Sequence, residues 1–333
     1  MKHGEIIAYD LVMVGLSLSL IVLGIVLFLV CKKKPVESEE TIPVKHCARA
    51  FPLTDIDAAT DGFNQRRIVG KGRLGIVYAG LLEKEELVAV KRINPLFVLS
   101  NAGFGFSSVL KGLSLAQHPN IVPIIGFSEA PGERIILTEF VRMVSLDFYL
   151  HLNPEGASLL GWNQRFRIAS GAARGLEYLH EVVAPNIFHG CVKSSNILID
   201  VNFCARISDY GLNFLAPQEK RGLVGYVDDE YWNYRGGGAC KESDVYGLGI
   251  VLLELLSGRE CEEGLLAKWA LPLIREMRYT EVLDPRLVIP SEMKPLVRLA
   301  KVASACVGNP RKCRPSIVQV VTILNNLEME VCF

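Results

Sequence analysis

Residues 70–78 read Gly-Lys-Gly-Arg-Leu-Gly-Ile-Val-Tyr, and residues 87–93 read Leu-Val-Ala-Val-Lys-Arg-Ile. Glycines at the first, third and sixth positions let main-chain N–H groups approach a polyphosphate closely, where a side chain would obstruct it. A dinucleotide-binding loop of this kind continues into a helix, whereas both stretches here read as strands joined by a charged turn. The two stretches therefore predict a β-hairpin over a phosphate-binding pocket, with Lys91 on its second strand.

The composition of the whole chain excludes several classes of protein. Its 333 residues include 36 Lys and Arg against 36 Asp and Glu, so the formal net charge is zero. A nucleic-acid-binding domain would carry a basic excess, and we therefore expect no nucleic-acid partner. Half of the residues are apolar and 22% are charged, which excludes a disordered or collagen-like chain. The nine cysteines include no Cys-x-x-Cys pair, which favours reduced thiols over a zinc ribbon or a disulfide framework.

An uncharged stretch of twenty residues, Leu11–Val30, lies near the N-terminus. A helix of that length spans about 30 Å, the hydrocarbon thickness of a bilayer, and it exceeds the apolar region of a cleaved signal peptide. Three lysines, Lys32–Lys34, follow it, and positive charge stays on the cytoplasmic side. We therefore predict a single-pass plasma-membrane protein with an extracellular N-terminus over 1–10, a transmembrane helix over 11–31, a juxtamembrane linker over 32–65 and a cytoplasmic body.

Further motifs follow the glycine-rich stretch, in an order and spacing typical of protein kinases. They read His118-Pro-Asn-Ile-Val122, His189-Gly-Cys-Val-Lys-Ser-Ser-Asn196, Asp209-Tyr-Gly211, Ser243-Asp-Val-Tyr-Gly-Leu-Gly249 and Arg314-Pro-Ser316. With these motifs, the chain resembles the plant receptor-like serine/threonine kinase family over roughly residues 51–330. The resemblance implies an α+β, bilobal protein-kinase-like fold after the transmembrane helix. The kinase-like domain would cover residues 66–330, with a β-rich small lobe over 66–140 and a helical large lobe over 141–330.

The resemblance also implies where ATP and Mg²⁺ would bind. The positions implied for ATP are Gly70, Lys71, Gly72, Gly75, Val77, Ala89, Lys91, Thr138, Glu139, Val141 and Lys193. The metal ligands would be Asn196 and Asp209. Two structural contacts are implied as well: Asp244 would bind the main chain of the catalytic loop, and Glu230 would pair with Arg314.

One residue of this pattern is missing from the small lobe. In this family the lysine at position 91 pairs with a glutamate on the helix that precedes His118. Counting back from His118 places Val109 at the glutamate position. The stretch Leu87–Ser128 contains no Asp or Glu, so no register of that helix supplies the carboxylate. We expect Lys91 to pair with Asp209 or with a bound phosphate, unless an acid distant in the sequence substitutes.

The catalytic loop and the segment after it depart from the pattern independently. Cys191 replaces the aspartate that accepts the substrate's proton, and Gly190 replaces the arginine before it. General-base help is worth about 10²–10⁴ in rate, and a thiol is a poor substitute, so Cys191 reads as a small buried filler. Residues 211–230 contain no Ser or Thr, only the hydroxyl of Tyr226, and Leu223 replaces the family threonine. No catalytic residue is therefore expected.

Three functions remain open from the sequence. The first is a membrane-anchored receptor-like pseudokinase that binds ATP and acts in signalling through protein partners, such as a co-receptor or an active kinase. The second is an active ATP-dependent serine/threonine kinase with an unusual catalytic loop. The third is a docking scaffold that binds no nucleotide. Phosphate transfer separates the first two, and stabilisation by ATP separates the third from both.

Overall fold

The chain divides into two units, residues 1–45 and 46–333. This computed structural model describes residues 15–19, 22–23, 47–100, 105–142, 144–152, 159–217, 219–232, 238–308 and 310–332. In the first unit, residues 15–19 and 22–23 are helical, and the remainder of the predicted membrane span over 11–31 lies outside the described residues. Within the described ranges, no helix combines the length and the apolar character that a membrane crossing requires.

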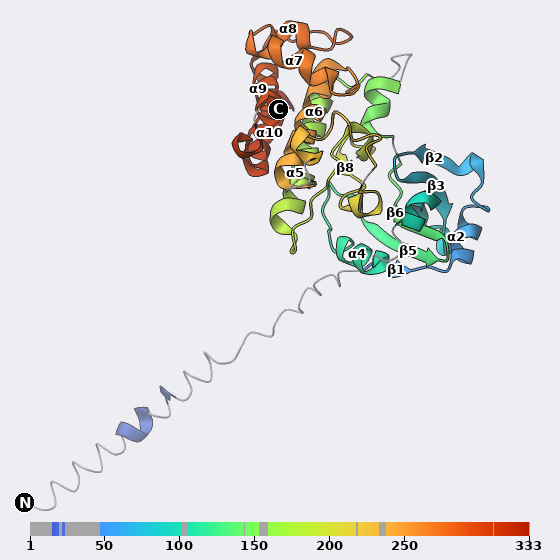
Figure 1. Cartoon of the computed structure of the whole chain (residues 1–333). Helices are drawn as coiled ribbons and strands as arrows, with labels where there is room; N and C mark the ends of the chain where they lie inside the picture. Colours follow the sequence, from blue (N-terminus) through green and yellow to red (C-terminus); the bar gives the residue numbers. More distant parts are fainter. Residues whose placement is uncertain are drawn as a thin grey trace, which may run out of the picture. The chain divides into compact units, whose positions relative to one another are not determined.

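The small lobe of the second unit is a six-stranded sheet in the order β1-β5-β6-β4-β3-β2. Strand β1 pairs in parallel with β5, and the remaining neighbours are antiparallel. The strands are β1 (Arg49–Ala50), β2 (Ile68–Lys71), β3 (Gly75–Leu81), β4 (Leu87–Ile93), β5 (Ile124–Ala130) and β6 (Glu133–Glu139). Figure 1 shows α2 (Leu53–Ala59) and α4 (Phe106–Leu113) beside this sheet. The lobe thus takes in residues 49–59 of the predicted juxtamembrane linker.

A cavity lies between the two lobes, and the alternation of side chains along strand β4 decides which of them line it. Successive side chains of a strand point to opposite faces of the sheet. Val88 and Val90 are fully buried against Ile56 of α2. Ala89 and Lys91 therefore point to the other face, where both line the cavity between the lobes. The apolar pattern of one strand thus fixes the direction of the lysine.

The large lobe is helical, and its helices lie on the far side of the cavity from the sheet (Figure 1). They are α5 (Trp162–Glu177), α6 (Lys241–Ser257), α7 (Leu265–Arg275), α8 (Tyr279–Val282), α9 (Lys294–Gly308) and α10 (Ile317–Cys332). Helix α6 is buried along almost its whole length, which explains its apolar sequence. Gly249 permits its close packing on α9, because a Cβ there would lie 2.6 Å from Cβ of Cys306. The predicted bilobal α+β fold is confirmed.

A two-stranded sheet lies in the large lobe beside the cavity. Strands β7 (Ile197–Ile199) and β8 (Ala205–Ile207) are antiparallel, with Ile197 opposite Ile207. Asn196 immediately precedes β7 and Asp209 follows β8, so the hairpin brings these two side chains to the same end. Ser208 N–H donates to the Asn196 carbonyl at 2.9 Å and fixes that end of the hairpin.

A buried ion pair ties helix α5 to the rest of the large lobe. Arg165 and Asp284 are joined at 2.6 Å, and their side chains are 1% and 0% exposed. The Arg165 guanidinium also donates to the main-chain carbonyls of Leu160 at 2.9 Å and Leu255 at 2.6 Å. One guanidinium therefore connects the start of α5, the end of α6 and the loop after α8.

We predict that Asp284→Ala lowers the free energy of unfolding by about 3–5 kcal/mol, because the Arg165 charge would stay buried without a counter-ion. Glu281→Ala is the matched control, since Glu281 pairs with Arg278 on the surface. We expect no measurable change from the control, because exposed pairs contribute little. Denaturant unfolding of both variants checks this, and equal losses in the two would contradict it.

Candidate functional site

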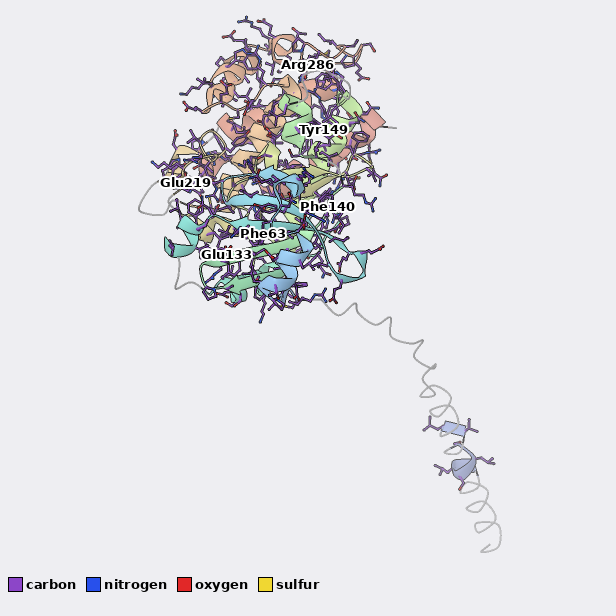
Figure 2. All side chains as sticks on the ribbon, turned by 90° about the vertical axis from the view of Figure 1, so that its right-hand side faces the viewer. Phe63, Glu133, Phe140, Tyr149, Glu219 and Arg286 are labelled. Atoms are coloured by element: carbon purple, nitrogen blue, oxygen red, sulfur yellow. The ribbon has the colours of Figure 1, made fainter. Side chains whose placement is uncertain are left out.

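A cavity of about 590 Å³ lies between the two lobes. Figure 2 shows Phe140, which lines it, between Phe63 and Glu133 of the small lobe and Tyr149 and Arg286 of the large lobe. The predicted positions that line the cavity are Gly70, Lys71, Gly72, Gly75, Val77, Ala89, Lys91, Thr138, Val141, Lys193, Asn196 and Asp209, together with Cys191. The structure therefore brings together residues that are more than a hundred positions apart in the sequence.

Glu139 is the predicted binding residue whose side chain turns away from this cavity. Its carboxylate forms a two-point ion pair with the Arg206 guanidinium, at 2.5 and 2.8 Å. Arg206 also donates to the main-chain carbonyl of Ile121 at 3.1 Å. The Glu139 side chain thus holds the connection between the lobes, and only its main chain remains near the cavity.

One end of the cavity is suited to a flat apolar ring. Val77 and Ala89 line it from the small lobe, and Leu198 lines it from strand β7. Among the described residues, the main-chain N–H of Val141 has no hydrogen-bond partner. A heterocycle held between these apolar side chains would meet a free donor at its edge, as small-molecule sites commonly provide.

Lys91 and Asp209 form an ion pair at the opposite end of the cavity. The ammonium of Lys91 donates to both carboxylate oxygens of Asp209. The side chains are only 16% and 22% exposed. Burial alone would raise the pKa of Asp209, but the Lys91 ammonium, with smaller help from His189 and Lys193, holds that pKa below its ordinary value. The predicted pairing of Lys91 with Asp209 is confirmed.

Helix α4 lies where the missing glutamate would be. A Cβ built on Gly211 would lie 2.6 Å from Cδ2 of Leu113, so α4 packs directly on the Asp209–Gly211 turn. Val109 is one helical turn before Leu113 and so lies on the same side of the helix. Val109 packs partly buried against the core. Helix α4 therefore brings aliphatic side chains and no acid to the Asp209–Gly211 turn.

Cys191 is buried under the segment that follows the Asp209 turn. Its thiol lies 3.8 Å from the carbonyl oxygen of Gly222, which also accepts from the Lys193 ammonium at 3.3 Å. Leu223, Val227 and Tyr231 form a small apolar cluster around the sulfur. Burial raises the pKa of the Cys191 thiol. The group is therefore a protonated donor to a carbonyl, and its sulfur is only a weak acceptor for the proton of a substrate hydroxyl.

The main chain of the catalytic loop is anchored as the sequence predicted. Asp244 accepts from the N–H groups of His189 and Gly190, both at 2.7 Å, and contacts Nε2 of His180 at 2.9 Å. Asn196 donates to the carbonyl of Cys191 at 3.0 Å and closes the loop from its other end. The loop geometry is thus retained although its acidic residue is not.

The predicted pairing of Glu230 with Arg314 is wrong. Arg314 donates to Asp228 at 2.6 Å, and Arg311 lies 2.8 Å from the same carboxylate. Glu230 instead accepts from the main-chain N–H of Arg311 at 3.4 Å. Asp228 is 4% exposed, whereas Glu230 is exposed. The largely buried guanidinium groups of Arg311 and Arg314 therefore pair with Asp228, which is buried with them.

Arg73, at the tip of the glycine-rich stretch, crosses the cavity. Its guanidinium donates to Asn213 Oδ1 at 2.9 Å and to the carbonyl of Ala216 at 3.0 Å. Asn213 in turn donates to the carbonyl of Gly190 at 2.8 Å and to the hydroxyl of Tyr231 at 3.0 Å. The sequence analysis missed this bridge, since no motif marks either Arg73 or Asn213. The glycine-rich hairpin and the segment after Asp209 are therefore tied to each other.

Gly190 is required by the same bridge. Its φ is +80°, in the region that favours glycine. A Cβ there would lie 1.8 Å from Nδ2 of Asn213. The arginine that the family pattern places at this position therefore does not fit beside Asn213 as the chain is folded.

The donor set does not fit a resident Mg²⁺ as the side chains are arranged. Among the described residues, no group of three or more acidic, histidine or cysteine side chains could hold a metal, so a Mg²⁺ ion here would depend on Asp209, Asn196 and the phosphates of a nucleotide. Asp209 is the one carboxylate at the predicted metal position, and Lys91 binds both of its oxygens. Mg²⁺ requires close octahedral oxygen ligands, so it would have to displace the lysine first.

Tyr226 and Glu254 anchor the segment that covers Cys191. The hydroxyl of Tyr226 donates to Glu254 at 2.6 Å, and Cys261 N–H reaches the same oxygen at 3.3 Å. The other oxygen of Glu254 is buried and has no partner in the part of the chain that is described. Burial raises the pKa of Glu254 to about 7, against opposing contributions from Tyr226 and His151.

This pKa predicts a stability that changes with pH. Because the folded state holds the Glu254 proton more tightly than the unfolded state, the free energy of unfolding should fall as pH rises from about 4.5 to about 7 and stay level above that. We predict that Glu254→Gln, which keeps an acceptor for Tyr226, is more stable than the parent by up to about 3 kcal/mol above this range and equal to it below. Denaturant unfolding across pH measures the difference. A constant difference at every pH would contradict the prediction.

The comparisons with known proteins agree with this geometry. A family model described as "Protein tyrosine and serine/threonine kinase" matches residues 63–324. The "Probable serine/threonine-protein kinase PBL6" of Arabidopsis thaliana is 34% identical over 314 residues, which are 88% of this chain and 72% of that protein. "Phytosulfokine receptor 1" of the same plant is 35% identical over 289 residues, which are 82% of this chain and 28% of the receptor.

A solved structure is similar over the same region. The pseudokinase domain of BIR2, described as an immune regulator of the RLK/Pelle family, superposes with a TM-score of 0.72 at 33% identity, covering 84% of this chain and 87% of that one. The chain spans 34%, 28% and 25% of the length of three of the relatives that it matches. The chain therefore belongs to the plant RLK/Pelle family of serine/threonine protein kinase domains.

Proposed function

We propose that this chain is a membrane-anchored, receptor-like pseudokinase, which binds ATP without transferring its phosphate and signals through protein partners. The observation that carries the proposal is the arrangement of Cys191 and Gly222. The thiol lies where the family has its proton-accepting aspartate, and the Gly222 carbonyl caps it at 3.8 Å. A substrate hydroxyl would meet a main-chain carbonyl and a protonated thiol at this position, and neither would orient it for attack.

Two further features support the absence of phosphate transfer. Lys91 holds the Asp209 carboxylate that would carry the metal, and transfer in this family depends on that metal to neutralise the developing charge. Arg73 fastens the glycine-rich hairpin to Asn213 and Ala216, so the hairpin is tied to the segment that follows Asp209. The departures therefore affect both the base position and the metal position.

We predict that the purified chain incorporates no radiolabelled phosphate into itself or a generic protein acceptor above the level of Lys91→Ala. Cys191→Asp tests the vacant base position, where a competent base is worth about 10²–10⁴ in rate. Cys191→Ser, similar in size and not acidic, is its matched control. Transfer by the unmodified chain that disappears in Lys91→Ala would contradict the proposal.

The active-kinase alternative rests on one observation of its own. The glycine-rich hairpin, Lys91, Asn196 and Asp209 all line a single cavity. If positioning alone supplied most of the rate, a missing base would slow turnover without abolishing it. The transfer assay decides between the two functions, and an absence of any thermal shift with saturating ATP would favour the nucleotide-free scaffold, since a ligand at 100 times its dissociation constant adds about 2.7 kcal/mol of stability.

A partner-based role is supported by the surfaces that the domain retains and by its relatives. The BIR2 structure is described as a pseudokinase domain from an immune regulator of the same family. A domain that keeps the fold without transfer can still act by binding, and the partner we propose is a co-receptor or an active kinase of this family. Its membrane position would bring it beside such receptors.

The proposed anchor is testable by itself. We predict that the full chain stays in the membrane fraction after alkaline carbonate extraction and that Leu20→Lys with Leu23→Lys releases it. Each lysine at the centre of a span costs about 2.5–3.5 kcal/mol on an insertion scale. Leu20→Ala with Leu23→Ala is the control, which should remain bound. Release of the unmodified chain would contradict the anchor.

A further inference from the structure

The cavity is lined by more positively charged side chains than its carboxylates neutralise. The cations that line the cavity are Lys71, Arg73, Lys91, Arg142 and Lys193, and the carboxylates are Asp147 and Asp209. Asp209 is already paired with Lys91, and Asp147 contacts Nδ1 of His151 at 3.0 Å. The remaining cations therefore face the cavity without a carboxylate partner among the residues that line it.

Two of these cations are fixed in place by neutral groups. Arg73 donates to an amide oxygen and a carbonyl, at Asn213 and Ala216. Lys193 donates to the carbonyl of Gly222 at 3.3 Å. A carbonyl or amide oxygen orients a cation but does not cancel its charge. Both side chains are thus held in position and retain a full positive charge for an anion.

From these contacts we propose that the cleft binds its nucleotide without Mg²⁺, as a metal-free polyphosphate anion whose charge Arg73 and Lys193 neutralise. This inference rests on the proposed nucleotide binding and specifies the form of the ligand. In an active member of the family, metal ions bridge the phosphates and the lysine has its own glutamate. Here Arg73 and Lys193 supply positive charge from the wall of the same cavity.

The Lys91–Asp209 pair makes the metal unfavourable. Mg²⁺ would need Asp209 as a ligand, and Lys91 would then lose its carboxylate while facing a divalent cation. Helix α4 offers no acid to receive the lysine, and the stretch from residue 87 to residue 128 contains none. Lys91 would then have only the phosphates of the nucleotide as a counter-ion, and it would share them with the metal. The metal therefore competes against the lysine, whereas a bare phosphate does not.

The direct test measures the affinity of the purified full chain for ATP by calorimetry, once with excess EDTA and once with excess Mg²⁺. We expect the dissociation constant in EDTA to be equal to or lower than that in Mg²⁺. Tighter binding with Mg²⁺ would overturn the inference and leave the proposed absence of transfer intact. No binding in either condition would overturn the inference together with the proposed nucleotide binding.

A variant at residue 109 tests the cause. Val109→Glu places a carboxylate at the position that the family pattern gives to the glutamate partner of Lys91, and so would free Asp209 for a metal. We expect ATP binding by Val109→Glu to become tighter with Mg²⁺ than with EDTA. Val109→Gln is the matched control of the same shape without charge, and it should behave as the parent. A folded Val109→Glu that gains no dependence on Mg²⁺ would overturn the assigned role of the Lys91–Asp209 pair.

The role proposed for the cations is tested separately, by measuring ATP binding in the absence of metal. Lys193→Ala should weaken ATP binding in EDTA at least tenfold and leave adenosine binding unchanged, because only the phosphates face the cation. Lys193→Arg keeps the charge and should bind ATP as the parent does. Equal weakening of ATP and adenosine binding would indicate a collapsed cavity and overturn the role of Lys193.

Discussion

The ion pair between Lys91 and Asp209 is the contact on which the rest of the cleft depends. A lysine ammonium in a largely buried position requires a counter-ion. Because the segment from residue 87 to residue 128 has no acid, the carboxylate after strand β8 is the acid that binds it. This pairing joins the two lobes directly, and it occupies the carboxylate oxygens that a metal would use. One absent glutamate therefore changes the small lobe, the lobe interface and the metal position together.

Contacts made by the segment after Asp209, several of them through main-chain carbonyls, complete the closure of the cleft between the lobes. The Gly222 carbonyl accepts from Lys193 and caps the Cys191 thiol, and Asn213 links Arg73 to Gly190. These acceptors are neutral, and none needs the phosphate charge that orders this segment in switchable kinases. The closed arrangement is thus held by the chain itself, consistent with a segment that has no Ser or Thr from residue 211 to residue 230.

The sequence predicts this fold well because its motifs occur in a fixed order around one cavity. The loss of the glutamate partner of Lys91 could also be predicted, since elimination of every acid in a stretch needs no alignment. The family pattern then left Asp209 or a bound phosphate as the partner, and the structure shows Asp209. The acid that pairs with Arg314 could not be predicted, because two acids lie two residues apart and only burial distinguishes Asp228 from Glu230. The bridge from Arg73 to Asn213 was missed for another reason: it joins residues 140 positions apart, and neither residue belongs to a recognised pattern.

The residues that hold the main chain are present in this chain, whereas the residues that would touch a substrate are replaced. Asp244 still binds His189 and Gly190, and Arg165 still pairs with Asp284. In contrast, Cys191 occupies the family position of the acid that faces a substrate hydroxyl, and Val109 occupies the position of the glutamate partner of Lys91. A buried ion pair that loses one partner is costly wherever it lies. A chain that was merely losing stability would therefore lose the residues that hold the main chain and the residues that would touch a substrate alike. The retained set is the one that fixes the shape of the large lobe, and the lost set serves only transfer. Under the proposed function, this division is what we expect of a domain whose shape is recognised by protein partners.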